Sequence, residues 1–282
     1  MLRVSLRRRG GEAPSATRKV VLGVAAAVIA AAVIAGAWFA CAKLRALWIE
    51  QCVLTDVARQ VTIDTGAHIK PGVILSCFGL RAGANLAEID FVEKRRETLA
   101  KIPNIRRLTV ERHLPDRVRI TVEERDPVAR MNVKNNRRST GRVTDAEGVV
   151  FMRQTDTESL PVIVEDPANV TAVGKTLSGR AAAALKLAQL CQTGEFAELG
   201  LQAIHTSPSD HLLAVLQTET SAIRVKIAWE GMDEPVSTTD DLMRKTIANL
   251  MSAIRTRYGD KAAVWIAMDP NRIYADTKEP IQ

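Results

Sequence analysis

The chain has 282 residues, 46% hydrophobic and 25% charged, a composition typical of a folded protein with one or two domains. Its net charge is +7, but residues 1–19 hold six basic residues against one acidic residue, which leaves only +2 for the rest. This distribution argues against nucleic acid as a partner, because such a partner requires a basic surface on the folded part.

The N-terminal region predicts a membrane anchor. Residues 1–19 are basic without apolar periodicity, which predicts a disordered cytoplasmic tail. Residues 20–42 carry no charge and, at about 1.5 Å per residue, are long enough for a transmembrane helix across a core of about 30 Å. The positive-inside rule places the N-terminus in the cytoplasm and the following domains outside. A cleaved signal peptide is the alternative, although its apolar core is usually shorter.

A stalk over residues 43–60 and a first domain over residues 61–126 follow. The pattern predicts a strand from Val61, a helix over 70–77 and a helix that begins at the N-cap Asp90. Val92, Leu99 and Ile102 recur on one face of the second helix, and Pro103 ends it. Two strands with period-2 alternation then surround a turn at Pro115 and Asp116. The predicted order is β-α-α-β-β.

The second domain is predicted over residues 127–276, with a tail over 277–282. Short alternating strands dominate it, and two helices are expected over residues 179–191 and 239–257. Two strands, over 263–268 and 272–275, close the domain. The predicted fold class is therefore α+β.

Catalytic and metal-binding patterns are weak. The exported cysteines Cys52, Cys77 and Cys191 lack Cys-x-x-Cys spacing and are either idle thiols or include one disulfide. The histidines lack His-Glu-x-x-His spacing. Residues 207–211 hold serine, aspartate and histidine, but a triad is assembled by fold geometry, so a polar loop is favoured. We expect no enzyme, metal, cofactor or small-molecule substrate.

Gly83, Asn85 and Pro103 precede the two-stranded hairpin, and Arg112, Pro115, Glu124, Arg125 and Pro127 lie in it or directly after it. With these residues and this order of elements, the chain resembles the FtsQ/DivIB family of bacterial cell-division proteins, in which a single span precedes a POTRA domain and a β domain. The resemblance continues beyond the first domain through residues 143–151 and 160–161. It implies a second domain with a curved antiparallel sheet and two helices. In the first domain it rests on motifs that include Gly83, Asn85, Pro103, Arg112, Pro115, Glu124, Arg125 and Pro127.

The resemblance implies a non-enzymatic scaffold at the division septum of the cell membrane, with its folded domains periplasmic or otherwise extracytoplasmic. Expected partners are FtsB- and FtsL-type membrane proteins and the septal peptidoglycan synthase complex. A partner strand would add to the C-terminal sheet edge, with Trp265 and Tyr274 as aromatic anchors. The alternatives are a membrane-anchored POTRA chaperone for envelope assembly and an anchored cell-wall enzyme. The expected partner-binding residues are Trp265, Ile266, Ala267, Met268, Arg272, Ile273, Tyr274 and Ala275.

Overall fold

The computed structural model describes residues 16–113, 115–136, 140–192, 194–217, 222–232, 239–258, 264–269 and 271–276. Residues 1–15 of the tail predicted over 1–19, and the tail predicted over 277–282, lie outside these residues, whereas residues 16–19 belong to a helix. The chain forms two compact units. The first includes the residues up to Thr62, with 79–89 and 111–119, and the second includes 63–78, 90–110 and the chain from Ile120 onward.

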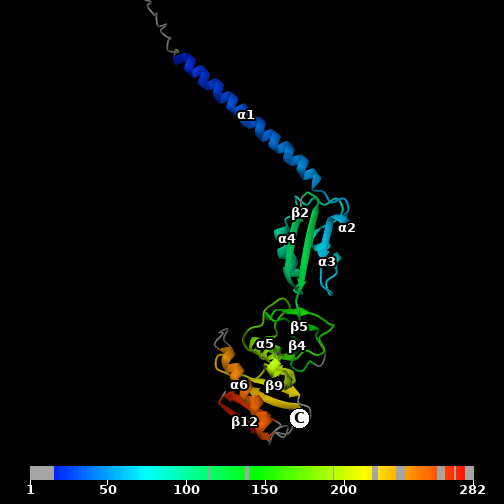
Figure 1. Cartoon of the computed structure of the whole chain (residues 1–282), viewed down its shortest axis with the longest axis vertical. Helices are drawn as coiled ribbons and strands as arrows, with labels where there is room; N and C mark the ends of the chain where they lie inside the picture. The colour runs from blue at the N-terminus through cyan, green and yellow to red at the C-terminus, as the bar shows by residue number, and fades with distance from the viewer. Residues whose placement is uncertain are drawn as a thin grey trace, which may run out of the picture. The chain divides into compact units, whose positions relative to one another are not determined.

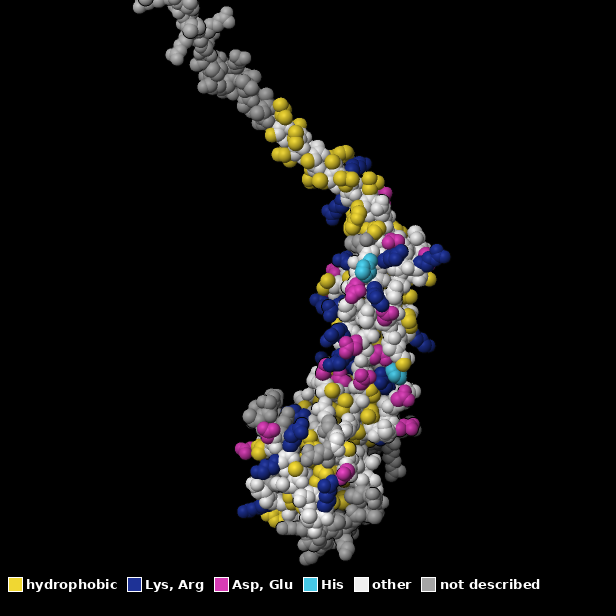
Figure 2. All heavy atoms as spheres, viewed as in Figure 1, with side chains coloured by type: hydrophobic (Ala, Val, Ile, Leu, Met, Phe, Trp, Pro, Cys, Tyr) yellow, Lys and Arg dark blue, Asp and Glu magenta, His cyan; other side chains and the backbone are white. Residues whose placement is uncertain are grey.

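A long helix, α1 (Ala16–Gln51), begins before the predicted span and continues beyond it. The extension follows from the absence of proline between Ala16 and Gln51, because propagating a helix is far easier than starting one. Its described part, Val28–Gln51, is long and apolar enough to cross a membrane, with a mean hydropathy of 1.6 over 18 of its residues. Figure 2 shows the hydrophobic side chains exposed along the part of α1 from Val28 onward.

From β1 onward, after the one-turn helix α2, the first domain has the predicted β-α-α-β-β order (Figure 1). Its three strands pair in the order β1-β3-β2. In α4 the buried side chains are Phe91 and Thr98, whereas Val92, predicted on the packed face, is 81% exposed. The packed face is therefore rotated from the predicted one, and the Phe91 ring lies 6.1 Å from that of Phe78. The elements are α2 (Val57–Gln60), β1 (Val61–Asp64), α3 (Pro71–Phe78), α4 (Phe91–Lys101), β2 (Ile105–His113) and β3 (Arg117–Glu124).

The second domain is built on a nine-stranded sheet of order β12-β11-β10-β9-β8-β7-β4-β5-β6. Its strands are β4 (Ala129–Val133), β5 (Arg142–Thr144), β6 (Val150–Met152), β7 (Val162–Glu165), β8 (Leu201–His205), β9 (Leu212–Gln217), β10 (Ala222–Ile227), β11 (Val264–Asp269) and β12 (Arg272–Asp276). Its helices are α5 (Gly179–Gln192) and α6 (Thr239–Ala253), with short turns η1 (Pro167–Asn169), η2 (Gly194–Leu199) and η3 (Ile254–Tyr258).

The α+β class is confirmed, but the sheet is mixed where antiparallel pairing was expected. β4 pairs parallel with β7, β7 with β8, and β10 with β11. Parallel neighbours need a crossover connection of about a dozen residues or more. The two predicted helices supply two of these connections, since α5 lies between β7 and β8 in the chain and α6 between β10 and β11.

Both helices contribute to one apolar core that covers one face of the sheet. Leu187 of α5 and Leu250 of α6 are fully buried, together with inward strand residues such as Ile204 and Val225. All four cysteines are free thiols, two of them buried, and burial raises the pKa of Cys191 to about 12. The core therefore fixes the terminal strands β11 and β12 from one side.

Candidate functional site

The C-terminal strand β12 is a terminal strand of the large sheet. Among the described strands it pairs with β11 alone, with Trp265 opposite Ala275 and Ile266 opposite Tyr274. A terminal strand offers backbone N–H and C=O groups to an incoming segment. All eight residues predicted to bind a partner lie on these two strands.

The opposite terminal strand, β6, has its outer side already hydrogen-bonded. The Val150 carbonyl oxygen accepts from Gly174 N at 2.7 Å, and Val150 N donates to Lys175 O at 2.9 Å. The Asn104 side chain donates to Met152 O at 2.7 Å. The two terminal strands therefore differ, because neighbouring segments cover the outer side of β6.

The β11–β12 pair divides its side chains between two faces. Trp265 is 1% exposed and belongs to the core, as does Ala267, and Ile273 and Ala275 pack against them. Tyr274 is 55% exposed and Met268 is 40% exposed. The prediction that Trp265 anchors a partner is corrected by this burial: its indole is held in the core.

The first-domain residues Gly83 and Asn85 hold a loop against the end of α1. Gly83 has a φ of +85°, in the region that favours glycine, and its N–H donates to Leu54 O at 2.8 Å. The Asn85 amide donates to Ile49 O at 3.2 Å, while its oxygen accepts from Ala87 N at 2.9 Å. Gly83 therefore joins the loop to Leu54, which follows α1, and Asn85 joins it to Ile49 in the last turn of α1.

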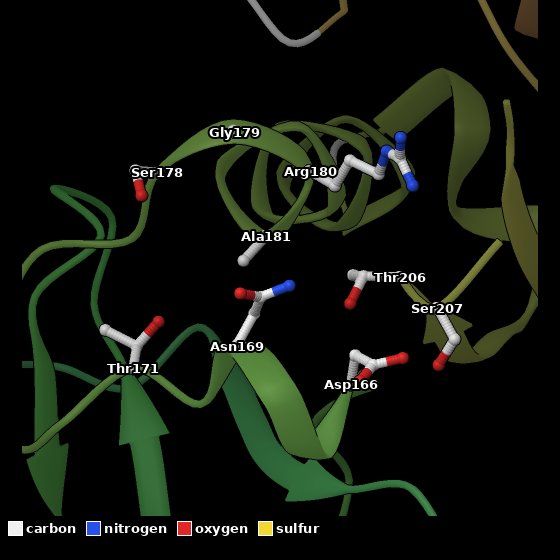
Figure 3. Close-up of a pocket in the computed structure, with 9 residues that line it drawn as sticks. All are labelled: Asp166, Asn169, Thr171, Ser178, Gly179, Arg180, Ala181, Thr206 and Ser207. Carbon is white, nitrogen blue, oxygen red and sulfur yellow. The ribbon is translucent and has the colours of Figure 1, made fainter. Parts of the chain in front are cut away.

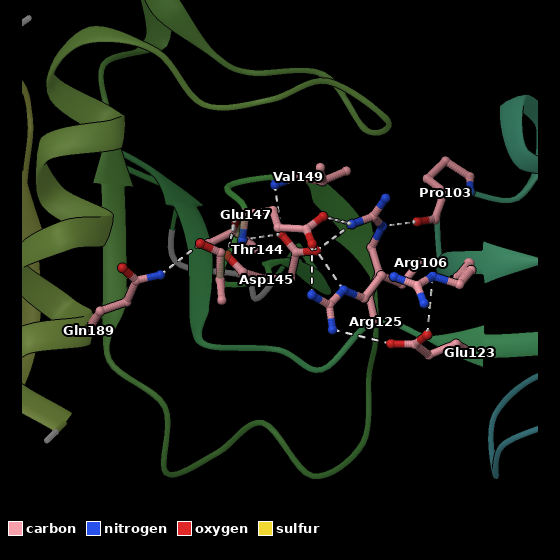
Figure 4. Close-up of polar contacts among 11 residues, drawn as sticks. Pro103, Arg106, Glu123, Arg125, Thr144, Asp145, Glu147, Val149 and Gln189 are labelled. Carbon is pink, nitrogen blue, oxygen red and sulfur yellow. Dashed lines mark hydrogen bonds and ion pairs between the residues drawn. The ribbon is translucent and has the colours of Figure 1, made fainter. Parts of the chain in front are cut away.

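A second group of motif residues surrounds the connection from β3 to β4, drawn in Figure 4. Arg125 donates through Nε to Pro103 O at 3.0 Å, and its Nη1 lies 2.5 Å from an Asp145 carboxylate oxygen. The other Asp145 oxygen accepts from Glu147 N and Val149 N, at 3.1 and 2.8 Å. The Asp145 carboxylate therefore holds the β5–β6 turn with one oxygen and neutralises the charge of Arg125 with the other.

Glu124 directly precedes Arg125 but contacts a different set of residues. Its carboxylate accepts from His68 N and Ile69 N, with a shortest distance of 2.8 Å, and lies 3.6 Å from Arg153. The Glu124 and Arg153 side chains are 9% and 10% exposed. Consecutive residues at the end of β3 thus contact both ends of the β5–β6 hairpin.

The remaining motif residues are more accessible. Arg112 and Pro115 are exposed on the β2–β3 hairpin, and Pro127 is half-buried in the connection to β4. Asp116 beside Pro115 accepts from the Gln60 amide at 3.2 Å. The resemblance in the first domain is therefore carried largely by residues that support loops and connections.

An outer layer of charge extends the Arg125 cluster. Arg106 bonds Glu147 at 2.8 Å and Glu123 at 3.2 Å, and all three side chains are roughly half exposed. Hydrogen bonds from Arg106, and then from Arg125, hold the pKa of Glu147 below its ordinary value. Asp145 and Glu147 lie in the turn between β5 and β6. The missed signal is this acidic turn opposite an arginine placed directly before Asp126-Pro127.

A polar cavity of about 420 Å³ lies beside the start of α5 (Figure 3). Its groups are engaged locally: Asp166 accepts from Ala168 N, and Arg180 donates to the carbonyl oxygens of Pro208 and Ser209. Near it, Asp210 lies 2.7 Å from His211 Nδ1, which lowers the pKa of Asp210. Within the part of the chain that the structure describes, no three His, Cys, Asp or Glu side chains are grouped so that they could hold a metal ion.

Two comparisons with known proteins bear on this architecture. A family model described as a POTRA domain of FtsQ type matches residues 58–125. The cell division protein FtsQ of Koribacter versatilis (strain Ellin345) is 27% identical over 179 residues, which cover 61% of this chain. The match spans about half of that relative, 48% of its length.

Proposed function

We propose that the chain is a non-enzymatic, single-span scaffold of the bacterial division machinery, of the FtsQ/DivIB type, since it matches the FtsQ-type POTRA model over residues 58–125 and is similar to a cell division protein FtsQ. The proposed topology places the N-terminus in the cytoplasm and both folded domains outside, at the division septum. Its contacts with other proteins would regulate septal peptidoglycan synthesis. The span is supported by residues 20–42, which carry no charge and lie within the helix α1.

The observation that carries the proposal is the difference between the two terminal strands of the large sheet. Neighbouring segments cover β6, whereas β12 pairs with β11 alone among the described strands and presents Tyr274. In strand addition, backbone hydrogen bonds supply affinity and alternate side chains supply specificity. We infer that a segment of an FtsB- or FtsL-type membrane protein adds to β12, with Tyr274 as its aromatic contact.

The test is co-purification of the full chain with FtsB- and FtsL-type proteins from the same cells. Tyr274→Ala removes an exposed aromatic side chain and leaves the core intact, so folding is preserved. Loss of one interface hot spot costs about 2 kcal/mol or more of binding free energy, which corresponds to an affinity lower by roughly 30-fold and a matching loss of capture at low partner concentration. Val92→Ala is the matched control, because Val92 is an exposed apolar residue on α4.

Equal capture by Tyr274→Ala and the unchanged chain would exclude this edge as the principal contact. A fluorescent fusion of the full chain tests the cellular role separately. If the chain is a division scaffold, we expect the fusion to collect at mid-cell and depletion of the chain to leave filamentous cells. Envelope-assembly defects without filaments would instead support a POTRA chaperone.

A further inference from the structure

The folded part of the first compact unit follows the end of α1 without a spacer. Cys52 N donates to Ile49 O at 3.0 Å, and the next residues already pair with the loop over 83–86. Leu86 N donates to Cys52 O and Leu54 N donates to Ala84 O, each at 2.8 Å. Cys52 and Leu54 are fully buried. The folded unit therefore begins at the residue that follows the helix.

The last turns of α1 expose an apolar stripe beside two cations. Leu44, Leu47 and Trp48 are 67%, 57% and 46% exposed. Their i, i+3, i+4 spacing places them on one face of the helix. Lys43 and Arg45 are exposed next to them, and Lys43 Nζ lies 5.9 Å from the centroid of the Phe39 ring. An aromatic and leucine face flanked by cations is typical of a segment at a membrane interface.

The position of this stripe along the helix matches the thickness of a lipid headgroup layer. If residues 20–42 cross the hydrocarbon core, Lys43 lies at its edge. Lys43 to Trp48 then rise by about 8 Å at 1.5 Å per residue. The headgroup layer on each side of the core is roughly 5–7 Å thick. Leu44 and Leu47 would therefore lie within that layer, Trp48 would lie at its outer limit, and Cys52 would lie about 6 Å farther out.

We propose that Leu44, Leu47 and Trp48 form an interfacial anchor at the headgroup layer, so that the folded part of the first compact unit that follows α1 lies against the lipid surface instead of standing off on a stalk. The occupant of the stripe is lipid, which Lys43 and Arg45 attract through anionic headgroups. The inference rests on the proposed membrane span and is independent of any division partner. Asn85, which donates to Ile49 O, positions the folded unit on this anchor.

The test uses tryptophan fluorescence of the full chain in vesicles of equal parts phosphatidylcholine and phosphatidylglycerol. The chain has four tryptophans; Trp229 and Trp265 are buried, whereas Trp38 and Trp48 are exposed. Two quenchers are compared, one a nitroxide on the lipid headgroup and the other bromine on the acyl chain. The variants are Trp48→Phe and Trp38→Phe, which retain an aromatic ring outside the folded core.

We expect Trp48→Phe to lose most of the headgroup quenching and Trp38→Phe to lose most of the acyl-chain quenching. Headgroup quenching that survives in Trp48→Phe, with acyl-chain quenching lost in Trp38→Phe, would overturn the anchor while preserving the span. If neither variant loses acyl-chain quenching, the span fails and the anchor fails with it. A second copy of the chain covering the stripe would also overturn the proposal: Trp48 would escape the headgroup quencher and copies would cross-link through Leu47→Cys.

Discussion

The Arg125 guanidinium and the Asp145 carboxylate form a largely buried ion pair across 2.5 Å, with side chains 13% and 5% exposed. Arg125 follows the last strand of the first domain, and Asp145 begins the turn between β5 and β6. Both lie in the second compact unit. Removal of Arg125 leaves the buried Asp145 carboxylate with only its two backbone N–H donors, whereas removal of Asp145 leaves Arg125 paired with Glu147 at 3.2 Å.

Replacing Arg125 is expected to destabilise the chain strongly. Arg125→Ala should lower the free energy of unfolding by about 3 kcal/mol, because Asp145 loses its cation while remaining buried. The measurement is guanidinium unfolding of the full chain in detergent micelles. Asp145→Asn should cost less, because a neutral amide retains an oxygen for the two backbone donors of the turn.

Arg106→Ala provides the control for this prediction. Arg106 joins the same cluster but is roughly half exposed, and exposed ion pairs contribute about 0–1 kcal/mol. If Arg106→Ala and Arg125→Ala proved equally destabilising, burial of the Arg125–Asp145 pair would not be the source of its importance.

Alanine substitutions at two glycines should change the stability in opposite directions. A Cβ at Gly66 would lie 2.6 Å from the Glu124 side chain, whose carboxylate is held by two backbone N–H groups. Gly66→Ala should therefore destabilise by about 1–3 kcal/mol through overpacking. Gly72, in the first turn of α3, has no atom within 4 Å of such a Cβ. Gly72→Ala should stabilise by about 0.5 kcal/mol. Thermal unfolding of both variants checks the pair, and a shift of the same sign in both would contradict it.

The sequence patterns predict elements better than they predict how those elements meet. The alternation of Val118, Ile120 and Val122 predicts β3, and all three are buried. Asp90 as N-cap is confirmed by its bonds to Val92 N and Glu93 N. These are local properties, since each depends on residues within a turn or a strand of one another.

Contacts between residues that are far apart in the sequence could not be predicted from these local patterns. Arg125 and Asp145 are separated by twenty positions, and only the fold brings the arginine to the turn. The indole of Trp265 shows the same limit, because alternation places it on one face of β11 without saying which face α6 covers. The parallel pairing of β10 with β11 likewise depends on the path of α6 between them.

His205 predicts a pH dependence of stability. It lies on β8, and its pKa is lowered first by burial and then by the charges of Lys134 and Arg224. A proton therefore binds more tightly to the unfolded chain, whose histidine has a pKa of about 6.5. Stability from the neutral imidazole is full above that value and is lost as the pH falls below it.

The measurement is the unfolding free energy at about pH 7.5 and about pH 5.5, on either side of the ordinary histidine pKa. His205→Gln should lose less stability than the unchanged chain over this interval, because glutamine does not titrate. His68→Gln, at an exposed position, serves as the control. An identical loss in His205→Gln and the unchanged chain would exclude His205 as a contributor.

The two aromatic residues of the β11–β12 pair separate a structural role from a binding role. Trp265 is a fully buried core residue, so Trp265→Ala should cost about 3–5 kcal/mol of unfolding free energy by leaving a cavity. Tyr274 is more than half exposed, so Tyr274→Ala should change the stability by no more than about 0.5 kcal/mol. Unfolding and partner capture are measured on the same preparations. Capture that falls in Tyr274→Ala at unchanged stability assigns that side chain to the interface. If Tyr274→Ala instead unfolds as readily as Trp265→Ala, its loss of capture would reflect damage to the sheet and would say nothing of strand addition.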